Sequence, residues 1–185
     1  KRTGKQSEGT QDYSMRDLDD FYEFLEDVNE YCKIQNIPAT TASSEFAPGQ
    51  FEINLNYTDN VLKAADDASL LRRIIKETAI KHEYEATFLS KPFLNEAGSG
   101  MHVHISLFDQ NNENIFCDKD GNDSKELFFA IGGLQNIMFD SFAFFASNQN
   151  AYRRFEPDIF VPVNTSWGHN NRSVAFRIPV SNNNA

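Results

Sequence analysis

The sequence predicts an α+β fold in which an antiparallel β-sheet is backed by helices. Short runs in which apolar and polar residues alternate recur along the chain, and this period of two is typical of half-buried strands. Between them lie longer stretches whose apolar residues are spaced three and four positions apart, as on one face of a helix. The length of 185 residues is sufficient for a domain with its own hydrophobic core.

Composition narrows the classes of function. The net charge is -10 and the isoelectric point is about 4.8, so the phosphates of a nucleic acid would be repelled. Two cysteines, Cys32 and Cys117, are too few for a disulfide framework and favour a reducing cytoplasm. The most apolar window, residues 127–146, contains Asp140 and other polar residues, which predicts a buried helix rather than a membrane span. We therefore expect a cytoplasmic protein that binds neither nucleic acid nor membrane.

The first predicted helix spans residues 15–35 and follows a polar segment, residues 1–12, that we expect to be a mobile loop. Ser14 stands at the position of a helix N-cap. The acidic residues on the outer face are interpreted as a solvated surface. The inward face consists of apolar residues at helical spacing: Leu18, Phe21, Leu25, Val28 and Cys32.

A β-hairpin is predicted next. Residues 39–46 form a plausible strand, and residues 51–57 alternate between apolar and polar side chains. The segment 47–50 between them has Pro48 and then Gly49 at its two central positions, which is the pattern of a type II turn. The two strands should therefore pair in antiparallel fashion.

This hairpin carries two candidate metal ligands, Glu45 and Glu52. If the residues on each side of the turn pair, these carboxylates lie directly opposite one another on one face, about 5 Å apart. Like charges placed there destabilise a sheet unless a cation or a proton lies between them. The alternative is that a bulge shifts the register and leaves both carboxylates solvated.

A second helix is predicted over residues 61–81, with Thr58 or Asp59 as its cap. His82 falls near its end, where we favour a capping role over a chemical one. Residues 84–89 predict a short strand. The inward residues of the helix are Leu71, Ile74, Ile75 and Ala79.

A third helix should begin after Ser124, whose hydroxyl can cap it. A wide apolar face makes it a core helix, formed by Leu127, Phe128, Ile131, Leu134, Met138 and Phe142. Its phenylalanines are interpreted as core residues, and they occupy positions 128, 129, 139, 142, 144 and 145.

A strand bearing two histidines follows the glycine-containing segment 98–100. Residues 101–107 alternate, which places His102, His104 and Ser106 on one face, about 7 Å from one to the next. Two imidazoles on a rigid strand are typical of part of a metal or anion site. The alternative is a solvated strand face without chemistry.

Arginines are concentrated late in the chain, with Arg154, Arg172 and Arg177 as the candidates. Guanidinium groups bind carboxylates and phosphates through paired hydrogen bonds, and carboxylates with an imidazole suit Mg²⁺ or Mn²⁺. A metal on one side and arginines on the other commonly support phosphoryl transfer. Arg172 and Arg177 would face opposite ways on a regular strand, so a bulge or bend between them is expected.

Three motifs together carry a family resemblance: Glu45-Phe-Ala-Pro-Gly-Gln-Phe-Glu52, Gly98-Ser-Gly-Met-His-Val-His-Ile-Ser106, and Pro162-Val-Asn with Asn171-Arg-Ser-Val-Ala-Phe-Arg-Ile-Pro179. In this order and spacing they resemble the catalytic domain of the glutamine synthetase family. The resemblance implies that residues 13–185 are part of a glutamine synthetase-like α+β domain truncated at both ends. Further metal carboxylates of the family are expected before Lys1 and after residue 180, and we expect the 185 residues alone to be inactive.

The resemblance also implies an activity: an ATP-dependent ligase that phosphorylates glutamate and lets ammonia or a primary amine displace phosphate from γ-glutamyl phosphate, with Mg²⁺ or Mn²⁺. The parent protein is expected to form a ring-shaped homo-oligomer. Arg172 is implied to stabilise the transferring phosphoryl group. The other roles implied by position are binding of the metal that orients glutamate by Glu45 and Glu52, binding of a second, ATP-associated metal by His102, ATP binding by His104, Ser106, Arg172 and Arg177, and glutamate binding by Gly98 and Arg154.

Departures from the family pattern point to one branch of it. Phe160 stands where glutamine synthetases proper have a glutamate that helps to deprotonate ammonium. Ser43 and Ser44 replace paired histidines, and Ala97 replaces a loop asparagine. Because an unpaired cation in an apolar pocket is costly, Phe160 favours a larger amine over ammonium. The pattern resembles the γ-glutamyl-amine and γ-glutamyl-polyamine ligases.

Two other classes of protein share parts of this pattern. A non-catalytic relative that acts as a binding or regulatory module is favoured only by the loss of the carboxylate at Phe160. A cupin-type metal site also uses two histidines on a strand, but it expects a glutamate where Leu107 and Phe108 stand, and we reject it.

Overall fold

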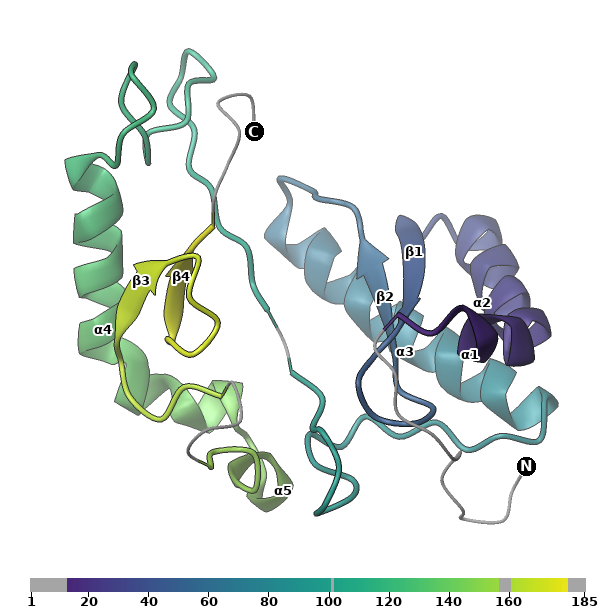
Figure 1. Ribbon diagram of the computed structural model, residues 1–185. Coiled ribbons are helices and arrows are strands. Elements are labelled where there is room, and N and C mark those ends of the chain that lie inside the picture. The colour runs from purple at the N-terminus through teal and green to yellow at the C-terminus, as the bar shows by residue number, and fades with distance from the viewer. Residues whose placement is uncertain (1–12, 101, 157–160, 180–185) are drawn as a thin grey trace. The chain divides into compact units, whose positions relative to one another are not determined.

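The computed structural model describes residues 13–100, 102–156 and 161–179, so the segment 1–12 lies outside the described residues. The chain forms two compact units. The first contains residues 1–88 and 95–99, and the second contains residues 89–94 and 100–185. Figure 1 labels the helices and strands of both units.

The first unit begins with two helices where the sequence predicted one. Helix α1 spans Met15–Asp20 and helix α2 spans Tyr22–Ile34. The prediction of a single helix was wrong because Phe21 leaves the helical conformation, with φ −107° and ψ 12°. The N-cap was predicted correctly, since the Ser14 hydroxyl accepts a hydrogen bond from the Asp17 N–H at 3.2 Å.

The core of the first unit lies between α2 and helix α3, which spans Val61–Lys81 as predicted. The cap of α3 is Asn60 rather than Thr58 or Asp59, because the Asn60 side chain accepts from the Lys63 N–H at 3.0 Å. Full burial of such a cluster contributes most of the stability of a small unit. Its buried members are Phe24, Val28, Cys32, Ile37, Leu71, Ile74 and Ala79.

His82 is the C-cap residue of α3, as predicted, and its backbone N–H donates to the Thr78 carbonyl at 3.1 Å. Its side-chain Nε2 lies 2.8 Å from Asp27 Oδ2 on α2, which joins the two helices. The predicted strand at 84–89 is absent, because no neighbouring strand pairs with this extended segment among the described residues. Tyr84 and Ala86 nevertheless pack against the core.

A β-hairpin completes the first unit. Strand β1, Ala39–Ser44, pairs antiparallel with strand β2, Phe51–Leu55. The inward side chains of β2 include Ile53 and Leu55, which pack against the helical core. Gly49 has φ 68°, a conformation that a type II turn requires at this position and that glycine adopts without strain.

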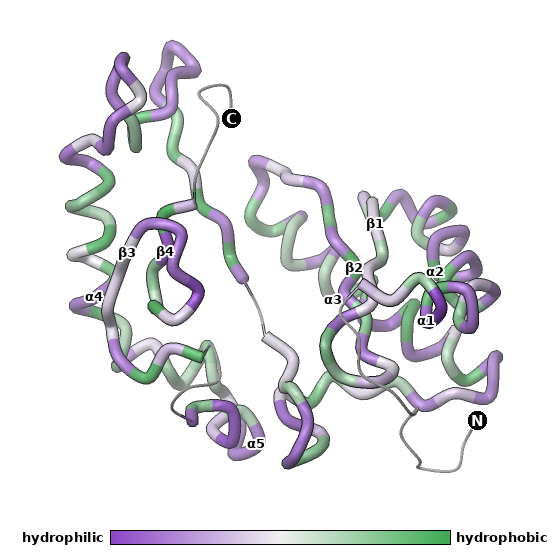
Figure 2. The backbone as a smooth tube through the Cα atoms, in the orientation of Figure 1, coloured by the Kyte–Doolittle hydropathy of each residue, from purple (hydrophilic) through white to green (hydrophobic). Residues whose placement is uncertain are grey.

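The second unit is organised along helix α4, Lys125–Phe145. The Ser124 hydroxyl caps it as predicted, accepting from the Leu127 N–H at 3.1 Å. Hydrophobic residues recur along the whole length of α4 in Figure 2. By length and composition α4 also meets the criteria for a membrane span, as core helices of soluble proteins can. The predicted burial of this helix was wrong for the described structure, in which Ile131 is its one buried residue.

The two sides of α4 differ in exposure. Most of the predicted inward side is turned away from solvent, with Ile131 buried and Leu127, Leu134, Met138 and Phe142 half-buried, but Phe128 is 42% exposed. The prediction that every phenylalanine of this helix fills the core was wrong. Phe129 is 74% exposed and Phe144 is 85% exposed, because they lie on the side of α4 that no described residue covers.

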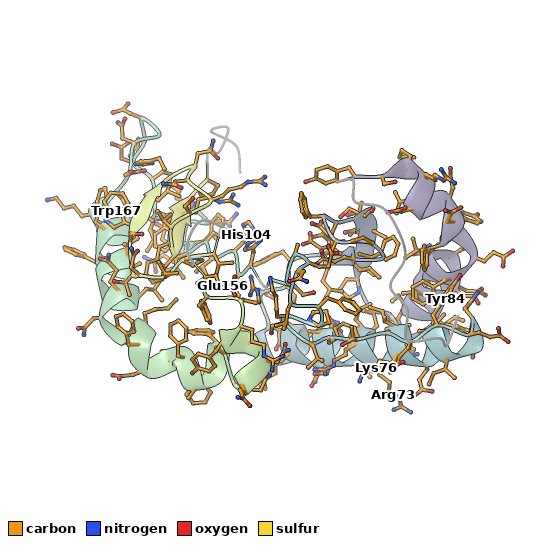
Figure 3. All side chains as sticks on the ribbon, turned by 60° about the horizontal axis from the view of Figure 1, so that its bottom comes forward. Arg73, Lys76, Tyr84, His104, Glu156 and Trp167 are labelled. Atoms are coloured by element: carbon orange, nitrogen blue, oxygen red, sulfur yellow. The ribbon has the colours of Figure 1, made fainter. Side chains whose placement is uncertain are left out.

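Short elements pack on α4. Helix α5 spans Gln149–Tyr152, strand β3 spans Trp167–His169 and strand β4 spans Phe176–Ile178. The Trp167 ring meets Phe128 of α4 edge-on, with ring centroids 5.5 Å apart; Figure 3 labels Trp167 beside α4.

Strands β3 and β4 run parallel, so the expectation of a single antiparallel sheet was wrong in this detail. The chain turns back between the two strands after Asn170, whose φ is 46°. The α+β class is confirmed: the described residues contain helices and two two-stranded sheets.

Candidate active site

The register of the hairpin differs from the prediction. Ser43 pairs with Glu52 and Ser44 pairs with Phe51, so Glu45 is not directly opposite Glu52. The register differs because the loop is longer than predicted. The Glu45 N–H donates to the Gln50 carbonyl at 2.8 Å, so the loop contains the four residues 46–49 and not only Pro48 and Gly49. The expected direct pairing of the two carboxylates is therefore wrong.

The two carboxylates nevertheless belong to the same face of the hairpin. Directly opposite residues of an antiparallel pair project to the same side, which places Glu52 with Ser43. The Ser43 hydroxyl in turn donates to Glu45 Oε1 at 3.4 Å. Glu45 and Glu52 are thus diagonal neighbours, a separation of about 7–8 Å between backbone positions, from which two side chains can converge on one Mg²⁺ or Mn²⁺ ion.

The Gly98 loop is attached to this hairpin by one side chain. The Gln50 carboxamide donates to the Gly98 carbonyl at 3.2 Å and to Ser99 Oγ at 3.3 Å. Its oxygen accepts from the Ala47 N–H at 3.1 Å. The structure thereby brings three residues with predicted site roles, Glu45, Glu52 and Gly98, into one unit. Sequence reasoning did not assign a role to Gln50, although it lies inside the first family motif.

The segment with the histidines is not a strand. Residues 102–107 belong to no strand in the described part of the chain. The Leu107 carbonyl accepts from the Ile115 N–H at 2.9 Å, and an isolated bridge joins Phe108 to Asn114. The strand prediction was wrong because an alternating sequence forms a strand only where a neighbouring strand is available to pair with its backbone. His102, His104 and Ser106 are exposed; His104 is labelled in Figure 3. Their metal-binding and nucleotide-binding roles stay predictions.

Arg154 is the candidate residue with the most unusual environment. Its guanidinium is desolvated, which lowers its pKa, and its Nε is buried without a hydrogen-bond partner among the described residues. Gly100 lies against this group: a Cβ added there would be 3.2 Å from Arg154 Nη2. A partly buried guanidinium with an unpaired N–H is suited to pairing with an anion, and the substrate-binding role of Arg154 stays a prediction.

The position of Arg154 is set by α5, which immediately precedes it. Asn148 caps α5, and the Asn150 side chain joins both backbone groups of Lys91, accepting from its N–H at 2.7 Å and donating to its carbonyl at 2.8 Å. Asn150 was not singled out from the sequence, since a contact across so many residues leaves no local pattern.

Arg172 and Arg177 are separated by the expected bend. Arg172 lies exposed in a turn, in which the Asn171 side chain accepts from the Ser173 N–H at 2.8 Å. Arg177 lies half-buried in β4. A further contact in this region, between His169 Nε2 and Asp123 Oδ2 at 3.1 Å, was not anticipated from the sequence.

The predicted site residues therefore fall in two groups. The first unit holds Glu45, Glu52 and Gly98, and the second holds His102, His104, Ser106, Arg154, Arg172 and Arg177. Among the residues that the structure describes, no three histidine, cysteine or acidic side chains gather as a metal-binding group. The metal-binding roles of Glu45 and Glu52 therefore stay predictions.

Comparison with known proteins identifies the family. The sequence model of the family described as glutamine synthetase, catalytic domain, matches residues 1–185. Gamma-glutamylputrescine synthetase PuuA of Escherichia coli (strain K12) is 49% identical over 170 residues, which cover 92% of this chain and 36% of that protein. Glutamate–isopropylamine ligase of Pseudomonas sp. is 35% identical over 167 residues, which cover 89% of this chain and 36% of that protein.

Solved structures agree with this assignment. GmaS without ligand matches with a TM-score of 0.79 and 25% identity, covering 96% of this chain and 41% of that one. Plasmodium falciparum glutamine synthetase matches with a TM-score of 0.76 and 30% identity, covering 82% of this chain and 29% of that one. The chain spans about a third of the length of the two relatives compared by sequence, 36% in each case. It belongs to the glutamine synthetase family.

Proposed function

We propose that the complete protein is an ATP-dependent ligase that joins the γ-carboxylate of glutamate to an organic amine or polyamine in preference to ammonia. The reaction would pass through γ-glutamyl phosphate. The observation that carries the proposal is the 49% identity to a γ-glutamylputrescine synthetase over 92% of the chain. As a further part of the proposal, the protein is cytoplasmic and forms a ring-shaped homo-oligomer.

A divalent metal, Mg²⁺ or Mn²⁺, fits the residues present. Glu45 and Glu52 share a face of the hairpin and would offer oxygen ligands to this metal. His102 would supply an imidazole to a second, ATP-associated metal, a role that is argued from the sequence alone. When bound, the first metal would neutralise charge that develops on the transferring phosphoryl group. Glu45 and Glu52 would hold their oxygens toward it, and the Ser43 hydroxyl would limit the rotation of Glu45.

Arg154 suits the α-carboxylate of glutamate. A carboxylate bound there would pair a desolvated guanidinium whose Nε has no hydrogen-bond partner in the described part of the chain, and two parallel hydrogen bonds would orient the substrate. Gly98 would contact the amino end of glutamate, since its loop is held on the hairpin that carries Glu45 and Glu52.

The remaining side chains serve ATP in this proposal. His104 and Ser106 would line the nucleotide, and their exposure leaves them accessible to it. Arg172 and Arg177 would bind phosphates, with Arg172 stabilising the transferring phosphoryl group. The bend between these two arginines places them in different local structures, a turn and strand β4, which suits separate contacts.

Support for an organic amine comes from Phe160, which lies outside the described residues and is therefore argued from the sequence alone. An apolar side chain at this position would favour the methylenes of an amine over a bare ammonium ion. The test is phosphate release by the full-length protein with ATP, Mg²⁺ and glutamate across a panel of monoamines, diamines, polyamines and ammonium. We expect an organic amine to give the highest rate, and a response to ammonium alone would refute the assignment to this branch.

A non-catalytic binding or regulatory protein is the second candidate, favoured by the same loss of a carboxylate at Phe160. It predicts no amine-dependent phosphate release under any condition. Calorimetry separates the two candidates further, because a ligase must bind ATP in the presence of Mn²⁺. The absence of such binding by the full-length protein would favour the second candidate.

A further inference from the structure

We propose that Gln50 is a positioning residue for glutamate: its carboxamide fixes the Gly98–Ser99 loop to the hairpin that carries Glu45 and Glu52. The inference rests on the proposed function, because it assigns a consequence for substrate binding. It also makes a structural claim that can be tested without any activity.

The carboxamide of Gln50 makes three hydrogen bonds. Its two N–H donors reach the Gly98 carbonyl at 3.2 Å and Ser99 Oγ at 3.3 Å, and its oxygen accepts from the Ala47 N–H at 3.1 Å. These three hydrogen bonds require a side chain that both donates and accepts, which excludes Glu, Lys and Arg. Among side chains of this length, only an amide meets the requirement. The side chain is half-buried, so water competes little for these bonds.

The backbone of Gln50 ties the same residue to the hairpin. Its carbonyl accepts from the Glu45 N–H at 2.8 Å, and its N–H donates to the Ala47 carbonyl at 2.9 Å. Gln50 directly precedes β2, on which Glu52 lies. One residue therefore connects both carboxylate-bearing segments to a loop 48 positions further along the chain.

The consequence concerns the two ends of the substrate. Under the proposed function, Gly98 would contact the amino end of glutamate. Glu45 and Glu52 would hold the metal that lies near the γ-carboxylate. The Gln50 bonds fix the distance between these two subsites. Loosening them would weaken glutamate binding, while ATP, whose predicted contacts lie in other segments, would be affected much less.

The kinetic test uses full-length Gln50→Met, which keeps the length and packing of the side chain but removes all three side-chain bonds. We expect the KM for glutamate to rise about tenfold while the KM for ATP changes less than about twofold. Ser99→Ala removes one bond and should give a smaller rise. The double variant should then be no worse than Gln50→Met, because both changes act on the same contact.

Matched controls separate positioning from general damage. Gln35→Met alters an exposed glutamine after α2 and should leave both KM values unchanged. A merely structural role of Gln50 would instead lower the fraction of active protein, so kcat would fall with both KM values constant. That outcome, or equal rises in both KM values, would overturn the inference.

The structural test measures the loop directly. A protease specific for glutamate can cleave after Glu96 only when the segment 95–99 opens, and we expect cleavage to be about tenfold faster in Gln50→Met than in the wild-type protein or Gln35→Met. Unchanged cleavage would refute the role of Gln50 whatever the enzyme does. If the wild-type protein shows no ligase activity, the proposed function fails, and this cleavage comparison still decides whether Gln50 holds the loop.

Discussion

The Ser43 hydroxyl donates a hydrogen bond to Glu45 Oε1 at 3.4 Å, and Ser43 itself lies directly opposite Glu52 in the hairpin. One small side chain thus stands between two carboxylates with predicted metal-binding roles. The neighbouring Ser44 faces the other way: it is 1% exposed and its hydroxyl donates to Asp17 Oδ2 at 3.3 Å.

The first prediction uses these two serines as a matched pair. Ser43→Ala should lower the affinity of the full-length protein for Mn²⁺ about threefold, because Glu45 loses a bond that orients it. Ser44→Ala should leave Mn²⁺ affinity unchanged but lower the free energy of unfolding by about 1 kcal/mol, because a buried hydrogen bond is lost. Calorimetric titration and thermal unfolding measure the two effects. Equal losses of Mn²⁺ affinity in both variants would contradict a specific role for Ser43.

The second prediction concerns the contact between Gly100 and Arg154. A Cβ at position 100 would be 3.2 Å from Arg154 Nη2, so Gly100→Ala should displace the guanidinium and raise the KM for glutamate about threefold. Arg154→Lys, which keeps the charge but loses the planar pair of donors, should raise it at least about tenfold. Steady-state kinetics with varied glutamate provide the measurement, and an unchanged KM in Arg154→Lys would remove Arg154 from the glutamate site.

The third prediction concerns a glycine in the middle of α4. A Cβ at Gly132 would meet nothing within 4 Å, so Gly132→Ala should raise the free energy of unfolding by about 0.5–1 kcal/mol through helix propensity. Gly49→Ala is the opposite control, because its φ of 68° strains any L side chain and should destabilise the hairpin. Thermal unfolding of the two variants checks both signs. Destabilisation by Gly132→Ala would show that this side of α4 is not open.

The fourth prediction separates the two thiols. Burial raises the pKa of the Cys32 thiol, which is 1% exposed, whereas Cys117 is exposed. Because the thiolate is the reactive form, a chromogenic thiol reagent should modify Cys117 quickly and Cys32 only on unfolding, at neutral pH and also near pH 8.5. In Cys117→Ser the fast phase should disappear. A fast phase that persists there would mean that the α2 face carrying Cys32 opens readily.

Features set by local pattern were predictable from the sequence. Helix α3 has the bounds that its apolar spacing indicated, and Ser14 and Ser124 cap the helices that follow them. Gly49 adopts the positive φ that the turn pattern required. These features depend on residues a few positions apart, and a single sequence contains all of that information.

Features set by pairing at a distance were not predictable. The hairpin register depends on where the Glu45 N–H finds its acceptor, and several registers satisfy the same alternating pattern. The alternation at 102–107 describes the side chains but not whether a neighbouring strand exists. The Gln50 contact with Gly98 spans 48 positions and leaves no periodic signal. The candidate site depends on such distant contacts, so its residues were identified by family resemblance rather than by geometry.

The most direct measurement is a competition between nitrogen donors. Full-length protein would be incubated with ATP, Mg²⁺ and glutamate together with equal concentrations of ¹⁵N-ammonium and an organic diamine, and the products would be identified by mass spectrometry. Our account predicts that the γ-glutamyl amide of the diamine is the main product, with release of phosphate that requires all components. Labelled glutamine as the main product would contradict the account.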